Sequence, residues 1–180
     1  DGIRDYKVTG VQTCALPISS VTLAGNIPAL GTGVWSQFSG PAGAVITNPA
    51  LYNTTVTGLV PGSYLFRWTI SFANCTSTTD DVIINIYDNP TPANAGPDQT
   101  ICSTTVTMAA NAPSIGTGTW TKVAGGTATI TTPGSPTTTI TGLAPGTYTF
   151  RWTISNNSCP SSSDDVQVVV DPAPTAANAG

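Results

Sequence analysis

Residues 141–155 read TGLAPGTYTFRWTIS, and this stretch decides the fold class of the chain. After its Pro-Gly turn, the apolar residues Tyr148, Phe150, Trp152 and Ile154 alternate with threonines and one arginine. Successive side chains of a β-strand point to opposite faces of the sheet, so a period of two indicates a strand with one buried face. We expect these four side chains to lie in the core of a β-sheet protein.

The same motif occurs a second time in the chain. Residues 57–71 read TGLVPGSYLFRWTIS, 84 positions before the first motif. An internal repeat of this length indicates two copies of one structural unit. We therefore expect Tyr64, Phe66, Trp68 and Ile70 to form the core of the other copy.

Further strands recur around the motif. Trp35 and Trp120 each follow a Gly-Thr-Gly sequence, and we expect each to begin a short central strand after a turn and to lie in the core. The last strand of each copy alternates valine or isoleucine with other residues, over 82–86 and 166–170. Additional candidate strands, separated by turns that contain Gly or Pro, cover residues 104–109, 128–132 and 137–141.

About seven short strands in each copy favour an all-β fold of tandem immunoglobulin-like antiparallel β-sandwiches. We expect a first sandwich over residues 20–90, truncated at its N-terminus, and a complete second sandwich over residues 91–174. Residues 175–180 end in the sequence Ala-Asn-Ala-Gly that also occurs at 93–96, so they are expected to begin a third repeat.

Residues 1–19 read DGIRDYKVTGVQTCALPIS and match nothing in either copy. They resemble a translated sequencing adapter of the kind found in metagenomic assemblies. A signal peptide is the alternative, but Asp1 and Asp5 lie where such a peptide is basic, and no apolar core of about 7–15 residues follows. We interpret this segment as an artefact and exclude it from the expected fold.

Residues 20–180 resemble the PKD-like (polycystic-kidney-disease-like) repeats of bacterial surface proteins. The resemblance rests on Gly-x-Trp, on Leu-x-Pro-Gly-x-Tyr-x-Phe-x-Trp-Thr-Ile and on a cysteine after that strand. Tyr148 is similar to the tyrosine corner of such sandwiches, in which the hydroxyl bonds back to the preceding turn.

The resemblance implies a non-catalytic spacer or stalk in a large secreted or cell-surface protein of the adhesin type. The alternative is an adhesion module that binds a glycan or a protein through loops at the ends of the sandwich. Neighbouring repeats of the same chain are the other expected partners.

The cysteines suggest one disulfide. Cys102 precedes the strand of Val106, and Cys159 follows the strand of Trp152. In a sandwich, we expect these two strands to lie in opposite sheets, so that the cysteines meet near one end, which predicts a Cys102–Cys159 bond. Such a bond fits an oxidising, extracellular compartment. Cys75 lacks a natural partner, because the position equivalent to Cys102 falls within residues 1–19.

The composition excludes several classes of function. The chain has no His and no Glu, and its net charge is −4. Without a basic patch we expect no nucleic-acid binding, and without a general base we expect no nucleophilic enzyme. No apolar run of about 18 residues is present, so we expect no membrane span.

Two site hypotheses remain open. Asp80, Asp81, Asp164 and Asp165 are weak candidates for binding Ca²⁺, which prefers several oxygen ligands, although paired aspartates are also common in turns. No other cofactor or metal is expected. The aromatic row could stack on sugars, but it shares its face with isoleucine, which favours a core role.

Overall fold

The computed structural model describes the backbone of residues 11–14 and the whole of residues 20–180. Residues 1–10 and 15–19, most of the adapter-like segment, lie outside the described residues. The chain divides into two compact units, Asp1–Asp88 and Asn89–Gly180. All regular structure in the described part of the chain is β-strand, and no helix that could cross a membrane occurs in it.

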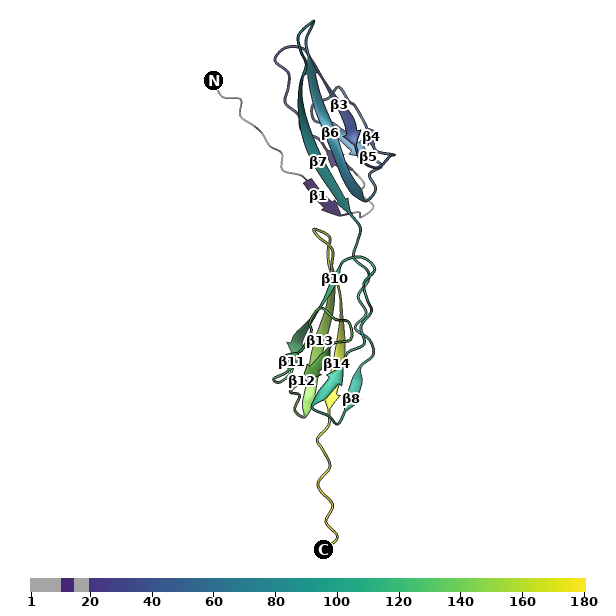
Figure 1. Cartoon of the computed structure of the whole chain (residues 1–180), viewed down its shortest axis with the longest axis vertical. Coiled ribbons are helices and arrows are strands. Elements are labelled where there is room, and N and C mark those ends of the chain that lie inside the picture. Colours follow the sequence, from purple (N-terminus) through teal and green to yellow (C-terminus); the bar gives the residue numbers. More distant parts are fainter. Residues whose placement is uncertain (1–10, 15–19) are drawn as a thin grey trace, which may run out of the picture. The chain divides into compact units, whose positions relative to one another are not determined.

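The second unit contains seven strands among its described residues (Figure 1). They are β8 (Gln99–Ile101), β9 (Thr105–Thr107), β10 (Thr117–Ala124), β11 (Thr129–Ile130), β12 (Thr139–Thr141), β13 (Gly146–Ser155) and β14 (Ser162–Val170). One sheet has the order β10-β13-β14-β8, and the other has the order β11-β12-β9. This is the sandwich expected from the spacing of the strands.

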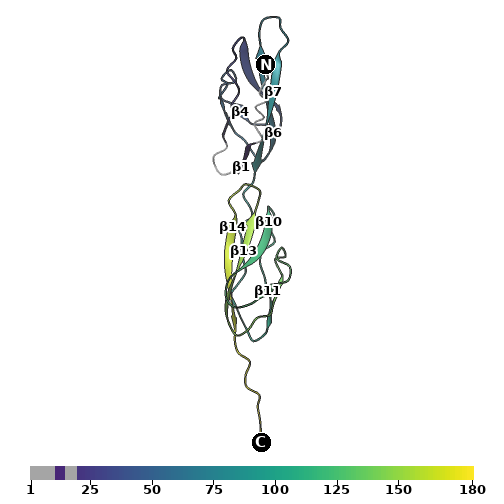
Figure 2. The ribbon, with the colours of Figure 1, turned by 90° about the vertical axis from the view of Figure 1, so that its left-hand side faces the viewer.

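The first unit repeats the arrangement. Its strands are β1 (Val11–Cys14), β2 (Val21–Thr22), β3 (Thr32–Ser39), β4 (Val45–Ile46), β5 (Thr55–Thr57), β6 (Gly62–Ser71) and β7 (Thr78–Tyr87). The sheets have the orders β1-β7-β6-β3 and β2-β5-β4. Figure 2 shows the long hairpin strands of each unit, β6 with β7 and β13 with β14, running along its length. The expected all-β tandem fold is confirmed.

One strand pair in each unit departs from the antiparallel pattern. β8 runs parallel to β14, with Gln99 opposite Val168 and Ile101 opposite Val170. β1 runs parallel to β7 in the same way, with Val11 opposite Ile84. The backbone of residues 11–14 therefore occupies the sheet edge that β8 occupies in the second unit, although these residues belong to the adapter-like segment.

The alternating residues of the repeated motif form the cores. Phe66, Tyr64, Trp152 and Phe150 are essentially inaccessible to solvent. The other predicted core residues Trp35, Trp68, Trp120, Tyr148 and Ile154 are also buried, and Ile70 is half-buried against the same cluster. Each core is contained within its own unit, because the two clusters share no residue.

The glycine of each Gly-x-Trp motif lies in a strand, not in the turn expected from the sequence. Gly33 is part of β3 and Gly118 is part of β10. A Cβ atom on either glycine would lie 2.0 Å from Cζ2 of a core tryptophan, Trp68 or Trp152. Glycine is needed here because the indole ring occupies the space of a side chain.

Candidate functional site

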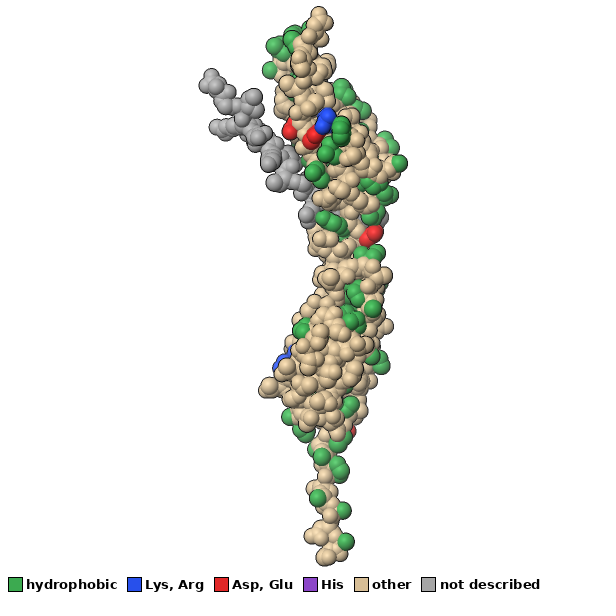
Figure 3. All heavy atoms as spheres, in the orientation of Figure 1, with side chains coloured by type: hydrophobic (Ala, Val, Ile, Leu, Met, Phe, Trp, Pro, Cys, Tyr) green, Lys and Arg blue, Asp and Glu red, His purple; other side chains and the backbone are tan. Residues whose placement is uncertain are grey.

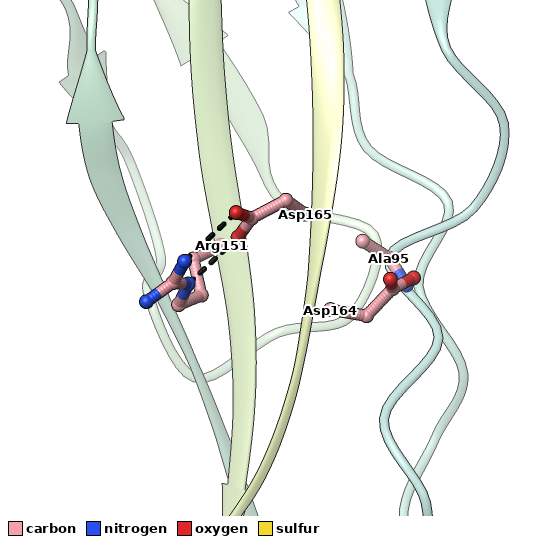
Figure 4. Close-up of polar contacts among 4 residues, drawn as sticks. All are labelled: Ala95, Arg151, Asp164 and Asp165. Atoms are coloured by element: carbon pink, nitrogen blue, oxygen red, sulfur yellow. Dashed lines mark hydrogen bonds and ion pairs between the residues drawn. The ribbon is translucent and has the colours of Figure 1, made fainter.

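The paired aspartates Asp164 and Asp165 lie next to each other on β14, and each makes a polar contact with another segment of the second unit (Figure 4). Asp165 points to the solvent side of the sheet, where its Oδ1 and Oδ2 accept hydrogen bonds from Nε and Nη2 of Arg151 at 2.7 and 2.8 Å. The hydrogen bond lowers the pKa of Asp165 and raises the pKa of Arg151. Both side chains are more than a third exposed, so the pair adds little stability.

Asp164 serves a different purpose from its neighbour. Its Oδ2 accepts a hydrogen bond of 2.8 Å from the backbone N–H of Ala95, 69 residues earlier in the chain. Figure 4 shows Asp164 and Asp165 pointing to different sides of β14. Adjacent strand residues diverge in this way because the side-chain period is two. The side chain of Asp164 thus holds the segment that enters the second unit against β14 by this hydrogen bond.

The first unit has the same outward ion pair. Asp81 accepts two hydrogen bonds from Arg67, at 2.7 and 2.8 Å, and this contact lowers the pKa of Asp81. The Arg67 guanidinium also lies 4.0 Å from the centre of the Phe38 ring, a cation–π contact. Asp80, the counterpart of Asp164, is exposed.

The four calcium candidates are not gathered into one cation site. Asp81 and Asp165 each bind an arginine, and Asp164 binds a backbone N–H. Ca²⁺ takes about 6–8 oxygen ligands. Within the described part of the chain, no three His, Cys, Asp or Glu side chains lie close enough together to hold a metal ion.

The Cys102–Cys159 disulfide predicted from the sequence is not formed, because Cys102 is a free, exposed cysteine. It follows β8, which pairs with the C-terminal end of β14, whereas Cys159 lies in the hairpin that precedes β14. The length of β14 separates these two ends by about 25 Å. A disulfide joins Cα atoms no more than about 7 Å apart. The strands of Val106 and Trp152, β9 and β13, do lie in opposite sheets as expected, but the prediction was wrong that Cys102 and Cys159 meet at one end of the sandwich.

The tyrosine corner is confirmed in both units. The Tyr148 hydroxyl donates to the carbonyl of Ala144 at 3.1 Å and accepts from its N–H at 3.0 Å. Tyr64 makes the same two contacts with Val60. These rings face the core, so the aromatic row does not offer a stacking surface to a sugar.

Sequence reasoning missed two features. The first is the set of hydrogen bonds between residues 93–98 and β14. It was missed because the donor of each bond is a backbone N–H, which every residue except proline has. The second is a set of exposed apolar residues in the first unit, among them Phe38 and Ile83. A comparison of the outward residues in the two copies would have detected the second feature.

Comparison with known proteins places the repeats in context. Residues 10–86 and 95–170 match the family described as "K319L-like, PKD domain". The solution structure of the PKD domain from the KIAA 1837 protein is 25% identical over 44% of this chain and 81% of that chain, with a TM-score of 0.39. The crystal structure of murine CEACAM1b is 16% identical over 90% of this chain and 96% of that chain, with a TM-score of 0.54, and supports the fold alone. No curated protein matches the chain.

Proposed function

Because the chain belongs to the PKD domain family, we propose that it is a non-catalytic spacer that carries mechanical load along a bacterial extracellular or cell-surface protein. Domains of this kind are generally structural or adhesion modules and typically occur in extracellular or cell-surface proteins. The single observation that carries the proposal is the path of the chain through the second unit, which enters at one end and leaves at the other.

The two ends of that path are tied to opposite ends of the sandwich. Thr91 donates its N–H to the carbonyl of Ile115 at 3.0 Å, next to the end where Thr117 pairs with Ser155. Asp171 donates its N–H to Ile101 at 2.8 Å, at the far end of β14 (Figure 1). A pull on both ends therefore acts along the whole length of the sandwich.

The segment that enters the second unit, residues 93–98, is hydrogen-bonded along β14. Ala93 N–H donates to Ser162 Oγ at 2.9 Å, and Ala95 N–H donates to Asp164 Oδ2 at 2.8 Å. Further along, the N–H of Gln167 donates to the Asp98 carboxylate at 2.7 Å, before the parallel β8–β14 pair begins. Because segment and strand run in the same direction, pulling the two ends apart shears these bonds together. Such an arrangement suits a load-bearing spacer.

Single-molecule pulling on the full chain through its termini tests the proposal. The Asp164→Ala variant removes the acceptor for Ala95, so one of the two unfolding events should move to lower force. Asp171→Ala is the matched control, because it removes an equal charge from an exposed side chain. The proposal fails if both units of the wild type unfold as soon as the chain is extended, or if D164A unfolds at the wild-type force.

An adhesion module is the second candidate, and one observation favours it. Three loop residues of the first unit, Ile27, Leu30 and Phe72, are 68%, 70% and 49% exposed. Leu30 and Phe72 lie near each other, because a Cβ on Gly31 would lie 3.0 Å from the Cβ of Phe72. Leu30 and Phe72 are thus neighbouring exposed apolar residues, and contiguous apolar surface is typical of a contact site.

A glycan array with a calcium titration separates the two candidates. A passive spacer should show only background binding, and its melting temperature should not depend on calcium. Glycan binding that is lost in Phe72→Asn, the residue type at the equivalent position 156, would favour the adhesion module. A calcium-dependent rise in melting temperature would revive the metal hypothesis for the aspartates.

A further inference from the structure

The outward surface of the sheet that contains β3, β6 and β7 is apolar in the first unit. We call it the outer face and define it by Val34, Phe38, Leu65 and Ile83, which surround the Arg67–Asp81 ion pair. Val34, Phe38 and Ile83 are 46%, 61% and 46% exposed, and Leu65 is half-buried. Figure 3 shows blue and red side chains bordered by green ones on this unit.

The second unit carries polar or smaller residues at the same positions of the same sheet. Its residues that correspond to Val34, Phe38, Leu65 and Ile83 are, in that order, Thr119, Val123, Thr149 and Gln167. It nevertheless keeps the ion pair, as Arg151–Asp165, and the strand register. The fold therefore does not require apolar side chains on this face.

Phe38 is displayed by a local irregularity of the backbone. The pairing of β3 with β6 shifts between Gln37 and Ser39, so Phe38 is the extra residue of a β-bulge. Bulges commonly re-aim a side chain. The exposed ring lies on the Arg67 guanidinium, next to the ion pair. An exposed phenylalanine in a cluster of aliphatic residues is a common mark of a protein contact.

We propose that the outer face binds the same face of a second copy of this chain. The face carries one positive and one negative side chain, so it is neutral and attracts neither a basic nor an acidic partner. A two-fold axis through the ion pair would place Arg67 opposite the partner's Asp81, with apolar residues packed on both sides. Arg67 and Asp81 already satisfy each other, which leaves a sugar few polar groups to bind.

The size of the outer face predicts weak association. Its exposed apolar side chains form a patch on the order of 300 Å², at the lower end for a functional patch on a monomer. Two such faces with their rims bury less than about 1,200 Å² in total, which is the range of transient contacts. We therefore expect a dissociation constant on the order of 0.1–1 mM, which multivalency strengthens where several copies are held side by side.

Sedimentation equilibrium of the full chain, from about 10 µM to about 1 mM, tests this proposal. Cys75 and Cys102 are free and exposed, so the thiols are first blocked with iodoacetamide to prevent disulfide-linked dimers. The test variant combines Val34→Thr, Phe38→Val, Leu65→Thr and Ile83→Gln, which gives the first unit the residues of the second. The control variant combines Ile27→Ala and Val45→Thr, which also copy the second unit but lie outside the outer face.

At about 1 mM, the weight-average mass of the wild type and of the control should rise to about 1.5–1.8 times the monomer mass, as a dissociation constant on the order of 0.1–1 mM requires. The test variant should bind itself at least tenfold more weakly while keeping its near-ultraviolet circular dichroism spectrum. Amide chemical shifts of the wild type that change on dilution should map to β3, β6 and β7. A wild type that stays monomeric, a test variant that associates as strongly as the wild type, or shifts that map to the second unit would each overturn the proposal.

Discussion

Replacing Gly118 by alanine tests the packing that the repeated motif imposes on the core. Gly118 lies in β10, and its missing side chain leaves room for the indole of Trp152. A Cβ at this position would lie 2.0 Å from Cζ2 and 2.3 Å from Cη2 of that ring. The ring is fully buried, so it cannot move aside without disturbing the residues around it.

The expected cost of this change follows from two opposing effects. Overpacking a dense core costs about 1–3 kcal/mol and occasionally more, and the short contact distance favours the upper end. Alanine recovers about 0.4–1 kcal/mol by restricting the unfolded chain. We expect a net loss of about 2 kcal/mol, which lowers the melting temperature of a domain of this size by roughly 8–16 °C.

Differential scanning calorimetry of the full chain measures this loss. Gly134→Ala is the matched control, because its Cβ would meet only the Gly118 carbonyl oxygen, at 3.9 Å. In a Trp152→Phe background the clashing ring atoms are absent, so Gly118→Ala should cost less than it does in the wild type. The reasoning is refuted if G118A and G134A melt together, or if the cost of G118A is unchanged in the W152F background.

Three further outcomes are expected. Tyr148→Phe removes the hydroxyl that bonds both backbone groups of Ala144, and should cost about 1–3 kcal/mol of unfolding free energy by denaturant titration; a loss below 0.5 kcal/mol would contradict a structural tyrosine corner. The folded-state pKa of Asp165 is depressed by the Arg151 hydrogen bond, so this pair stabilises above the unfolded pKa and the contribution is lost as the pH falls through the folded value. The small difference in melting temperature between wild type and Asp165→Asn should therefore shrink below about pH 4, and a difference that grows there would be inconsistent with this sign. Cys102 should react with iodoacetamide in the native protein, as mass spectrometry of the intact chain would show, and resistance to labelling without denaturant would contradict its exposure.

The repeated motif allowed much of the fold to be predicted. Tyr148, Phe150, Trp152 and Ile154 alternate strictly with polar residues, and all four are buried. This prediction succeeds because the side-chain period of a strand is a local property of the chain. The tyrosine corner is local as well, since hydroxyl and acceptor lie four residues apart.

One error is local, since Gly33 and Gly118 lie in strands and not in turns, but the disulfide error and the missed contact of Asp164 concern partners far apart in sequence. The disulfide prediction depended on the end of the sandwich at which each of Cys102 and Cys159 lies. The parallel pairing of β8 with β14 places the two cysteines at opposite ends. The hydrogen-bond partner of Asp164 is a backbone N–H 69 residues away, and a pattern of side chains in the sequence cannot predict such a contact. The candidate calcium ligands are different: Asp164 and Asp165 are adjacent in sequence, but their side chains point to different sides of β14.

The amino-acid sequence by itself determined the repeat, the strands and the inward row of aromatic side chains, because hydrophobic alternation acts over a few residues. Only the tertiary structure decided that Asp164 fastens the entering segment, that Cys102 is free, and that Phe38 and Ile83 share one exposed face. Those outcomes depend on strand order, register and direction. Hydrogen bonds and packing between distant segments set these three properties, and they become defined only when the sandwich closes.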